Sequence, residues 1–225
     1  MIYNILFEKY GPQGWWPLVE AKELLPKHSG KKPANDKERF EIIVGAILTQ
    51  NTSWKNVEKA IFALNTKGLL SAEAILKTSH NELAEAIKSA GYYNQKAIKL
   101  KAVAEFFKQN KSCFLEQDAK ELRERFLEVK GIGKETADSI VLYAFEKPTF
   151  VIDAYTKRLA ERLNLTKNLD YDSLQSLFES NLPKDYNIYK EYHALIVEHA
   201  KRFCNKNPKC EGCPLREICS FCFLR

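Results

Sequence analysis

The segment Val129-Lys130-Gly131-Ile132-Gly133-Lys134-Glu135-Thr136-Ala137 decides the fold of this chain. It lies between two amphipathic patterns, so it predicts two helices joined by a tight hairpin over about residues 122–145. Glycine can adopt φ values that side chains forbid, and it lets backbone N–H groups point at an anion near a helix start. Gly131 and Gly133 therefore predict a phosphate site, to which Lys130 and Lys134 would add sequence-independent charge. An ordinary helix–turn–helix corner with glycine caps is the alternative.

A carboxylate follows this hairpin, directly after the apolar stretch 148–152. Asp153 stands where the N-cap of a further helix belongs, and its role could be limited to accepting the N–H of Thr156. A carboxylate held by helix N–H donors also stays ionised at neutral pH. That state is needed to stabilise an oxocarbenium-like sugar or to orient a water against it. Both roles can coexist in one residue.

Apolar residues recur at helical spacing over most of the chain, so we predict an all-α protein. Asn35, Ser79 and Asp118 each precede a glutamate by three residues, as at the start of a capped helix, and glycines mark the expected stops. Alternating strand patterns are scarce. Further helices are expected over residues 53–65, 95–109, 134–145, 154–164, 171–181 and 188–203. Proline and glycine cluster at residues 11–33 and around Pro148, which are the candidate junctions between sub-domains.

The composition is that of a globular protein with a polyanionic partner. The 225 residues are 45% hydrophobic, and the net charge is +6 with a pI near 8.9. Lysines and arginines that neutralise phosphates release counterions, which favours binding to nucleic acid. No apolar run reaches the length of a membrane span, and the first residues lack a secretory pattern. We expect a monomer in the prokaryotic cytosol or nucleoid, with no membrane partner.

Four cysteines near the C-terminus have the spacing Cys204-x5-Cys210-x2-Cys213-x5-Cys219, with Cys222 beyond them. In a cytosolic chain such crowding indicates a metal site rather than disulfides. Structural zinc is one possibility, although zinc modules usually have two short Cys-x2-Cys knuckles and this chain has one. Basic residues surround the cysteines: Lys201, Arg202, Lys206, Lys209 and Arg216.

Together the hairpin, Ile152-Asp153 and the terminal cysteines resemble the helix-hairpin-helix DNA glycosylase superfamily, specifically its endonuclease III branch. The stretch 47–52 resembles the family loop whose glutamine fills the gap left by a flipped base, and 91–97 resembles its intercalating loop. The resemblance covers about residues 36–220. It implies a six-helix barrel domain, 36–149, inserted into a second helical domain formed by 1–35 and 150–225. Double-stranded DNA with a damaged base would bind between the two domains.

The resemblance also implies roles for individual residues. Asp153 would be the catalytic aspartate, Gln50 the gap filler and Tyr92 the wedge, while Thr136 would join the hairpin residues in binding DNA. The cysteine spacing resembles the family's four-iron four-sulfur signature, Cys-x6-Cys-x2-Cys-x5-Cys, with the first gap one residue short. Cys204, Cys210, Cys213 and Cys219 would hold the cluster, and Cys222 could replace Cys219. Such a 4Fe-4S cluster would shape a basic DNA-contacting loop and perform no chemistry.

One departure from the family pattern concerns the reaction itself. In bifunctional members a lysine directly before the hairpin's Thr-Ala forms a Schiff base with the sugar, and this chain has Glu135 there. A carboxylate cannot form an imine, and Lys134 lies about 100° away around the helix. We therefore expect a monofunctional glycosylase that uses water as its nucleophile, with Glu135 beside Asp153 in the catalytic set.

The tandem tryptophans suggest which base is removed. Gly14-Trp15-Trp16-Pro17, together with the segment from Gln50 to Trp54, resembles the methylpurine DNA glycosylase II group, also described as 3-methyladenine DNA glycosylase III-like. In that group the Trp-Pro pair stacks on the extruded base, so the resemblance implies a base pocket formed by Trp15, Trp16, Pro17 and Trp54. An indole face attracts a cationic alkylated purine. The tryptophans could instead only pin the N-terminal arm. The alternative functions are excision of oxidised pyrimidines or mismatched bases, and non-catalytic binding of damaged DNA by a metal-stabilised protein.

Overall fold

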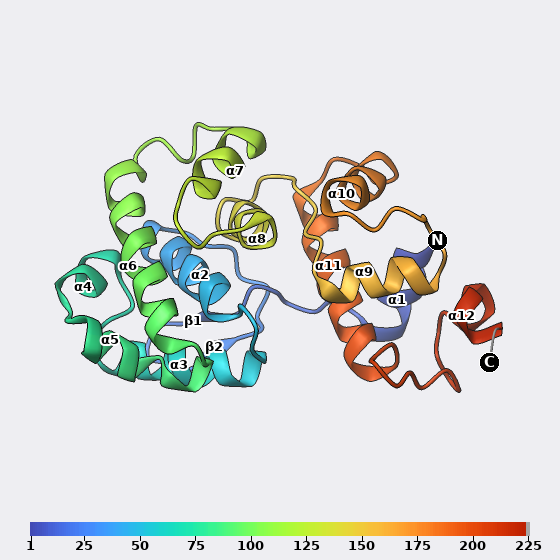
Figure 1. Cartoon of the computed structure of the whole chain (residues 1–225), viewed down its shortest axis with the longest axis horizontal. Helices are drawn as coiled ribbons and strands as arrows, with labels where there is room; N and C mark the ends of the chain where they lie inside the picture. The colour runs from blue at the N-terminus through green and yellow to red at the C-terminus, as the bar shows by residue number, and fades with distance from the viewer. Residues whose placement is uncertain (224–225) are drawn as a thin grey trace. The chain divides into compact units, whose positions relative to one another are not determined.

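The computed structural model describes residues 1–223, and these residues are mostly helical (Figure 1). They divide into two compact units, of which unit 1 comprises Met1–Trp15 with Pro148–Arg225 and unit 2 comprises Trp16–Lys147. The helices of unit 2 are α2 (Asp36–Leu48), α3 (Trp54–Thr66), α4 (Ala72–Lys77), α5 (His80–Ala86), the 3-10 helix η1 (Lys88–Ala90), α6 (Tyr93–Asn110), α7 (Ala119–Leu127) and α8 (Lys134–Ala144). The helices of unit 1 are α1 (Ile2–Tyr10), α9 (Ala154–Arg162), α10 (Tyr171–Ser180), α11 (Tyr186–Arg202), the 3-10 helix η2 (Arg216–Ile218) and α12 (Ser220–Phe223).

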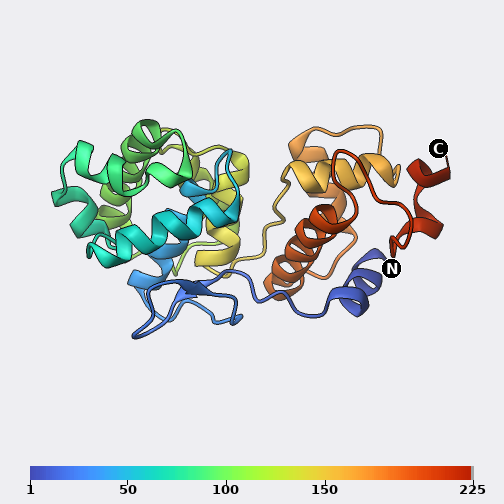
Figure 2. The same ribbon diagram turned by 90° about the horizontal axis from the view of Figure 1, so that it is seen from below.

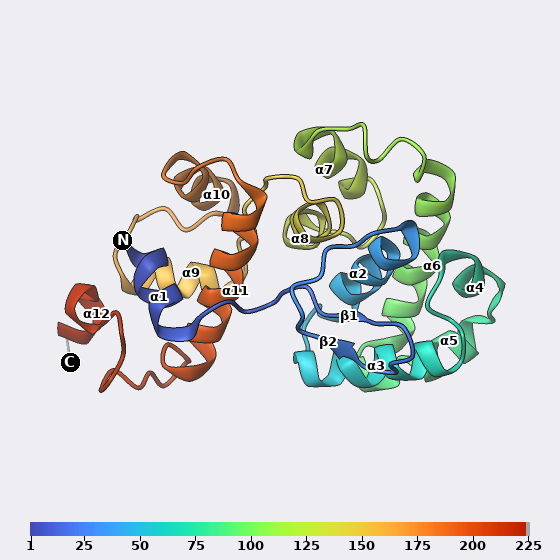
Figure 3. The same ribbon diagram turned by 180° about the vertical axis from the view of Figure 1, so that it is seen from behind.

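Helix α2 forms the centre of unit 2. Every residue from Phe40 to Leu48 is buried, because α3, α6 and α8 all contact this helix. Figure 3 shows α2 surrounded by these neighbours. The last eight residues of α8 except Ser139 are buried as well. Inside this contact Asp138 is fully buried and accepts a 2.8 Å hydrogen bond from the guanidinium of Arg123 on α7, which ties the two helices of the hairpin together.

Residues 16–35 belong to unit 2, whereas the sequence suggested that they join the chain ends. They form a short antiparallel ribbon of β1 (Leu18–Val19) and β2 (Pro26–Lys27), seen in blue in Figure 2 against the helices of unit 2. The backbone N–H of Val19 donates to the buried carboxylate of Glu41 on α2 at 2.7 Å. This contact and the burial of Trp16 and Leu18 explain the placement. Two-residue strands leave no alternating pattern in the sequence, so the ribbon was not expected.

The predicted helix starts are present in the structure. Asn35, Ser79 and Asp118 each accept a hydrogen bond from the backbone N–H three residues on, and Asp118 with Glu121 forms a complete capping box. The helices end earlier than the glycine signals suggested. Helix α5 ends at Ala86, with η1 between it and Gly91, and α7 ends at Leu127, four residues before Gly131.

Unit 1 is built around α11, which contacts both α1 and α9 (Figure 3). Its core contains a cluster of rings in which Phe150 stacks on Phe178 at 4.5 Å and meets Tyr189 and Tyr192 edge-on. Phe150 directly precedes the segment that carries Asp153, so this cluster anchors the backbone on which the aspartate stands. None of the helices within residues 1–223 is long and apolar enough to cross a bilayer.

Candidate functional site

The hairpin between α7 and α8 has one glycine whose conformation requires glycine. Gly131 has a φ of 92°, in the region that side chains rarely adopt. Gly133 is the N-cap of α8 with a φ of −98°, which any residue can adopt, so the sequence expectation of a forbidden φ holds only for Gly131. Val129 and Ile132 are buried and fix the turn to the body of unit 2.

The space around the two glycines also differs. A Cβ on Gly131 would lie 2.7 Å from Cγ of Lys99, because the Lys99 side chain crosses the hairpin there. A Cβ on Gly133 would meet nothing within 4 Å. Gly133 therefore leaves open space at the N-terminus of an 11-residue helix, where unpaired N–H groups favour an anion. Lys130 and Lys134 are exposed on either side of this space.

Gln50 is joined to the hairpin by its own side chain. Its Nε2 donates to the hydroxyl of Thr136 at 3.0 Å and to the carbonyl of Gly131 at 3.3 Å. Its Oε1 accepts from Nζ of Lys99 at 2.5 Å. The predicted gap filler thus has a fixed amide orientation. Thr136, expected among the DNA contacts, is buried with its hydroxyl on Gln50.

Tyr92 begins α6 on an exposed turn. Its side chain is 71% exposed, and its φ of 47° follows a φ of 70° at Gly91, so two successive residues are left-handed. Such a conformation is costly for a non-glycine residue and is kept only where the surrounding structure enforces it. An exposed ring on a constrained turn can enter a base stack without first becoming ordered. This is the geometry expected of a wedge residue.

The next turn of α6 holds a buried lysine that the sequence did not single out. Lys96 is 2% exposed, and its Nζ donates to the carbonyls of Leu48 at 2.9 Å and Ala90 at 2.8 Å. Burial, with a smaller effect from the charge of Lys99, lowers the pKa of Lys96 to about 8. The side chain is therefore mostly an ammonium at neutral pH.

Asp153 is the N-cap of α9 and is almost fully buried. One carboxylate oxygen accepts from the backbone N–H of Thr156 at 2.7 Å and from its hydroxyl at 2.8 Å. The other oxygen lies 3.6 Å from Nε2 of His193 on α11. Burial would raise the pKa of Asp153, but His193 and the two donors of Thr156 outweigh it and hold the pKa below its usual value. The carboxylate is therefore ionised at neutral pH.

His193 is a site residue that sequence reasoning missed. None of the four histidines has a motif around it, and His193 reaches Asp153 across 40 residues of chain only because α11 packs against α9. The other predicted catalytic residue, Glu135, is exposed in the first turn of α8, where its charge suits the helix dipole.

The tandem tryptophans separate into different surroundings. Trp16 is 7% exposed and meets Trp54 edge-on at 5.5 Å and Tyr143 at 5.2 Å. Its ring lies over Gly45, where a Cβ would come within 2.9 Å of it. Pro17 is buried next to it, while Trp15 belongs to unit 1 with the ammonium of Lys201 5.9 Å from its ring. Trp16, Pro17 and Trp54 thus lie in one unit, with Tyr143 as an additional aromatic neighbour.

Comparison with known proteins identifies the family. Residues 44–184 match the family model of the HhH-GPD superfamily base excision DNA repair proteins. The chain belongs to this superfamily. A Methanocaldococcus jannaschii protein named as a proposed DNA repair glycosylase is 46% identical over 224 residues, covering 97% of this chain and 94% of the relative. The HhH-GPD chain is thus a base excision repair DNA glycosylase, which hydrolyses N-glycosyl bonds.

Solved structures agree with this assignment. The HhH-GPD chain is 27% identical to the H. pylori 3-methyladenine DNA glycosylase MagIII bound to 1,N6-ethenoadenine. The match has a TM-score of 0.71 and covers 89% of this chain and 96% of that one. A trapped endonuclease III–DNA covalent intermediate shares the fold at 19% identity, with a TM-score of 0.78 and coverage of 99% and 94%.

The five cysteines near the C-terminus of the glycosylase line one small cavity. Cys204, Cys210, Cys213, Cys219 and Cys222 all contribute to its wall. Arg162 of α9 holds the cysteine loop, because its guanidinium donates to the thiol of Cys204 at 3.2 Å and to the carbonyl of Asn205 at 2.8 Å. Within residues 1–223 no three His, Cys, Asp or Glu side chains are arranged to hold a single metal ion. Several thiols around one cavity are a donor set that suits soft metals and clusters.

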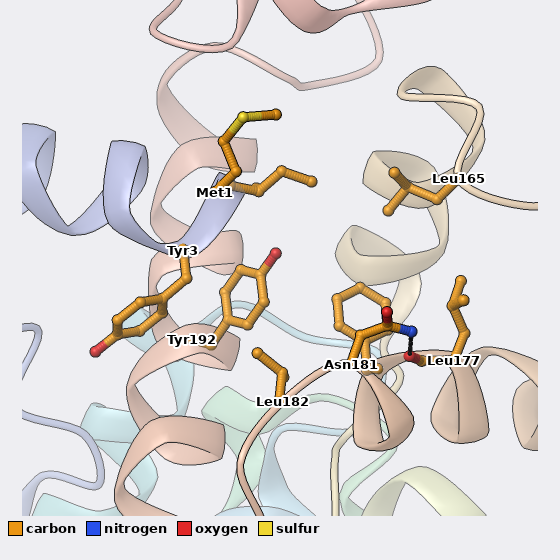
Figure 4. A pocket seen from close by; sticks show the side chains of 9 residues that line it. Met1, Tyr3, Leu165, Leu177, Asn181, Leu182 and Tyr192 are labelled. Carbon is orange, nitrogen blue, oxygen red and sulfur yellow. Dashed lines mark hydrogen bonds between the residues drawn. The ribbon is translucent and has the colours of Figure 1, made fainter.

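A second cavity, of about 370 Å³, lies within unit 1 and is lined mostly by apolar side chains of α1, α10 and α11 (Figure 4). The ring of Tyr192 lies in the middle of this group, near Leu182. Among residues 1–223, no carboxylate, histidine or lysine lines this cavity.

The two hairpin glycines give a matched prediction. Gly133→Ala should change the free energy of unfolding by less than about 1 kcal/mol, because its φ suits alanine and its Cβ meets open space. It should still weaken binding to duplex DNA roughly tenfold, since the methyl group enters the space left for a phosphate and removes one charge-assisted hydrogen bond. Gly131→Ala should instead destabilise the fold by at least about 1–2 kcal/mol. Thermal unfolding and fluorescence-anisotropy titration measure the two effects, and equal stability losses would contradict this account.

Proposed function

We propose that this protein is a monofunctional glycosylase that hydrolyses the N-glycosidic bond of alkylated purines such as 3-methyladenine and leaves an abasic site. The observation that carries the hydrolytic mechanism is the buried, ionised carboxylate of Asp153. A fixed negative charge stabilises the oxocarbenium-like sugar that develops as the base leaves. The same carboxylate can orient the water that attacks the sugar. His193 and Thr156 maintain this charge, so the aspartate does not become protonated near neutral pH.

Glu135 supports hydrolysis without a covalent intermediate. It stands at the position where bifunctional relatives carry their lysine nucleophile, in the first turn of α8. A carboxylate there forms no imine and adds a second negative charge to the catalytic set. We infer that water is the only nucleophile and that strand cleavage by this enzyme is weak.

The preference for a cationic purine rests on the aromatic group around Trp16. A positively charged alkylated base is attracted to an indole face by about 0.5–2 kcal/mol beyond ordinary stacking. We assign the stacking role to Trp16 and Pro17, with Trp54 as their neighbour. Trp15 has the ammonium of Lys201 near its ring, and we assign it to the attachment of the N-terminal arm. The likeness to the H. pylori 3-methyladenine DNA glycosylase bound to 1,N6-ethenoadenine supports a modified purine as the substrate.

The leaving base needs little acid catalysis, because alkylation already makes it a good leaving group. Flipping it out of the duplex still costs a few kcal/mol. We propose that Gln50 and Tyr92 offset this cost by entering the duplex. Gln50 would fill the gap left by the base, and Tyr92 would hold the neighbouring bases apart. The backbone of the hairpin, with Lys130 and Lys134, would hold the phosphate backbone without reading sequence.

We further propose that Cys204, Cys210, Cys213 and Cys219 hold a four-iron four-sulfur cluster. Their shared cavity and the soft chemistry of thiolates support this assignment. When bound, the cluster would keep the basic C-terminal loop in shape for contact with DNA. No step of base removal depends on it.

The cluster assignment predicts a visible spectrum. Protein purified without oxygen should be brown and absorb visible light, and its iron and sulfide contents should be close to four each per chain. A colourless protein with one zinc ion per chain would support the zinc alternative. Cys222→Ala should keep the absorbance if Cys219 is the ligand, whereas Cys219→Ala should lose it.

The mechanism predicts a selective effect at Asp153. Asp153→Asn should lower the rate of base release by about 100-fold or more, because a neutral amide cannot stabilise the developing cation. Asparagine can still cap α9, so affinity for damaged duplex should change little. Single-turnover release from methylated DNA and anisotropy titration measure the two quantities. Full activity of the variant would disprove the role of Asp153.

The monofunctional reaction is tested by trapping. Borohydride reduces an imine to a stable amine, so incubation of the enzyme with damaged duplex and borohydride should give no covalent protein–DNA band. Glu135→Lys places an amine at the family's nucleophile position and is the positive control for trapping. A covalent adduct with the unmodified enzyme would contradict the proposal.

A further inference from the structure

Two loops of unit 2 carry the side chains that we assign to insertion into DNA, and one buried side chain touches both. Gln50 lies two residues after Leu48, and Tyr92 lies two residues after Ala90. The ammonium of Lys96 donates to the carbonyls of Leu48 and Ala90 at 2.9 and 2.8 Å. The two segments are 42 residues apart in sequence, so this single group joins them in space.

The backbone of both loops is in a conformation that needs support. Asn51 follows Gln50 with a φ of 54°, and Tyr92 has a φ of 47°. Left-handed backbone is costly at non-glycine positions and is retained where surrounding contacts enforce it. Hydrogen bonds from a charged donor are about twice as strong as neutral ones, and burial of Lys96 strengthens them further. The buried ammonium is therefore well suited to hold both turns.

We propose that Lys96 is a positioning residue that fixes the spacing between Tyr92 and Gln50, so that both side chains enter the duplex as one unit. This inference rests on the proposed insertion roles of Gln50 and Tyr92. It does not depend on which damaged base the enzyme removes. Lys96 touches neither DNA nor substrate and acts through the two carbonyls.

Helix α6 provides a matched control for the loss of such a lysine. Lys101 donates from its Nζ to the carbonyls of Ile75 at 3.1 Å and Thr78 at 2.5 Å, at the end of α4. It binds helix-end carbonyls as Lys96 does, but the segment that it holds carries no residue assigned to DNA insertion. Lys96→Met and Lys101→Met both keep an apolar stem and remove the donors. A general effect of losing a helix-capping lysine should therefore appear in both variants.

The test uses the full chain and a duplex in which 2-aminopurine stands beside a tetrahydrofuran abasic-site analogue. Insertion of side chains unstacks the probe and raises its fluorescence, and this readout requires no alkylated base. We expect Lys96→Met to lower the fluorescence change and the rate of its appearance by about 10- to 100-fold. A group misplaced by about 1 Å typically causes a loss of this size. Affinity for undamaged duplex should stay within about threefold. Lys101→Met should retain the fluorescence change, and thermal unfolding of both variants measures their folding.

A double-mutant cycle shows whether Lys96 acts through the inserted residues. In a Tyr92→Ala background, Lys96→Met should have a much smaller further effect than in the unmodified enzyme, because one of the two groups that it positions is gone. Additive effects, a full fluorescence change in Lys96→Met, or equal losses in the two lysine variants would each overturn the proposal. An unmodified enzyme that unstacks the probe but does not release alkylated purines would refute the proposed substrate and leave the role of Lys96 standing. If the unmodified enzyme does not unstack the probe, the insertion roles and the role of Lys96 both fail.

Discussion

The contact between α2 and α8 is the interaction on which the part of unit 2 that we propose faces DNA depends. Both helices are buried along most of their length, so their relative position is fixed by apolar packing, and the Asp138–Arg123 pair ties α8 to α7. The C-terminal end of α2 is thereby held beside the N-terminal end of α8. As a result the amide of Gln50 reaches Gly131 and Thr136 directly. The side chain that we assign to gap filling and the turn that we assign to phosphate binding are thus joined directly by hydrogen bonds.

The carboxylate of Asp153, to which we assign the catalytic role, depends on a different balance. Burial disfavours a charged Asp153, and only the donors of Thr156 and the neighbouring His193 keep it ionised. The carboxylate that we propose for catalysis is therefore also the cap of α9, since the bonds that begin this helix also maintain its charge. A reaction that passes through a cationic sugar benefits from a negative charge that is already in place before the base leaves. The superfamily assignment and the local electrostatics support the same chemistry by independent routes.

The sequence predicted the parts of the fold that are encoded by local patterns. The starts of helices with strong apolar spacing and an N-cap, such as those after Asn35 and Asp118, were predicted within a residue or two because the side chain that caps them is near in sequence. The cap role of Asp153 and the special backbone of Gly131 were predicted for the same reason. The sequence placed the segment 16–35 in the other unit, because its attachment depends on contacts between residues far apart in sequence, such as the hydrogen bond of Val19 to Glu41 and the packing of Trp16 over Gly45.

The missed residues of the site share a physical property. Lys96, Lys99 and His193 act across long sequence separations, and a lysine on a helix resembles an ordinary solvated residue until its partners are known. Their partners are backbone carbonyls, an amide and a carboxylate on other elements, and no local spacing encodes such contacts. Gly133 illustrates the opposite case, since its motif suggested a special backbone and the structure shows ordinary backbone with open space beside it.

The most direct test of this account is the identity of the base that the purified enzyme releases from defined duplexes. Separate duplexes with a methylated purine, an oxidised pyrimidine or a mismatched base would be incubated with excess enzyme, and the freed bases would be identified by mass spectrometry. The account predicts rapid release of 3-methyladenine, intact strands with abasic sites, and little release from the other duplexes. Preferential release of an oxidised pyrimidine or a mismatched base, or release of no base from any duplex, would contradict it.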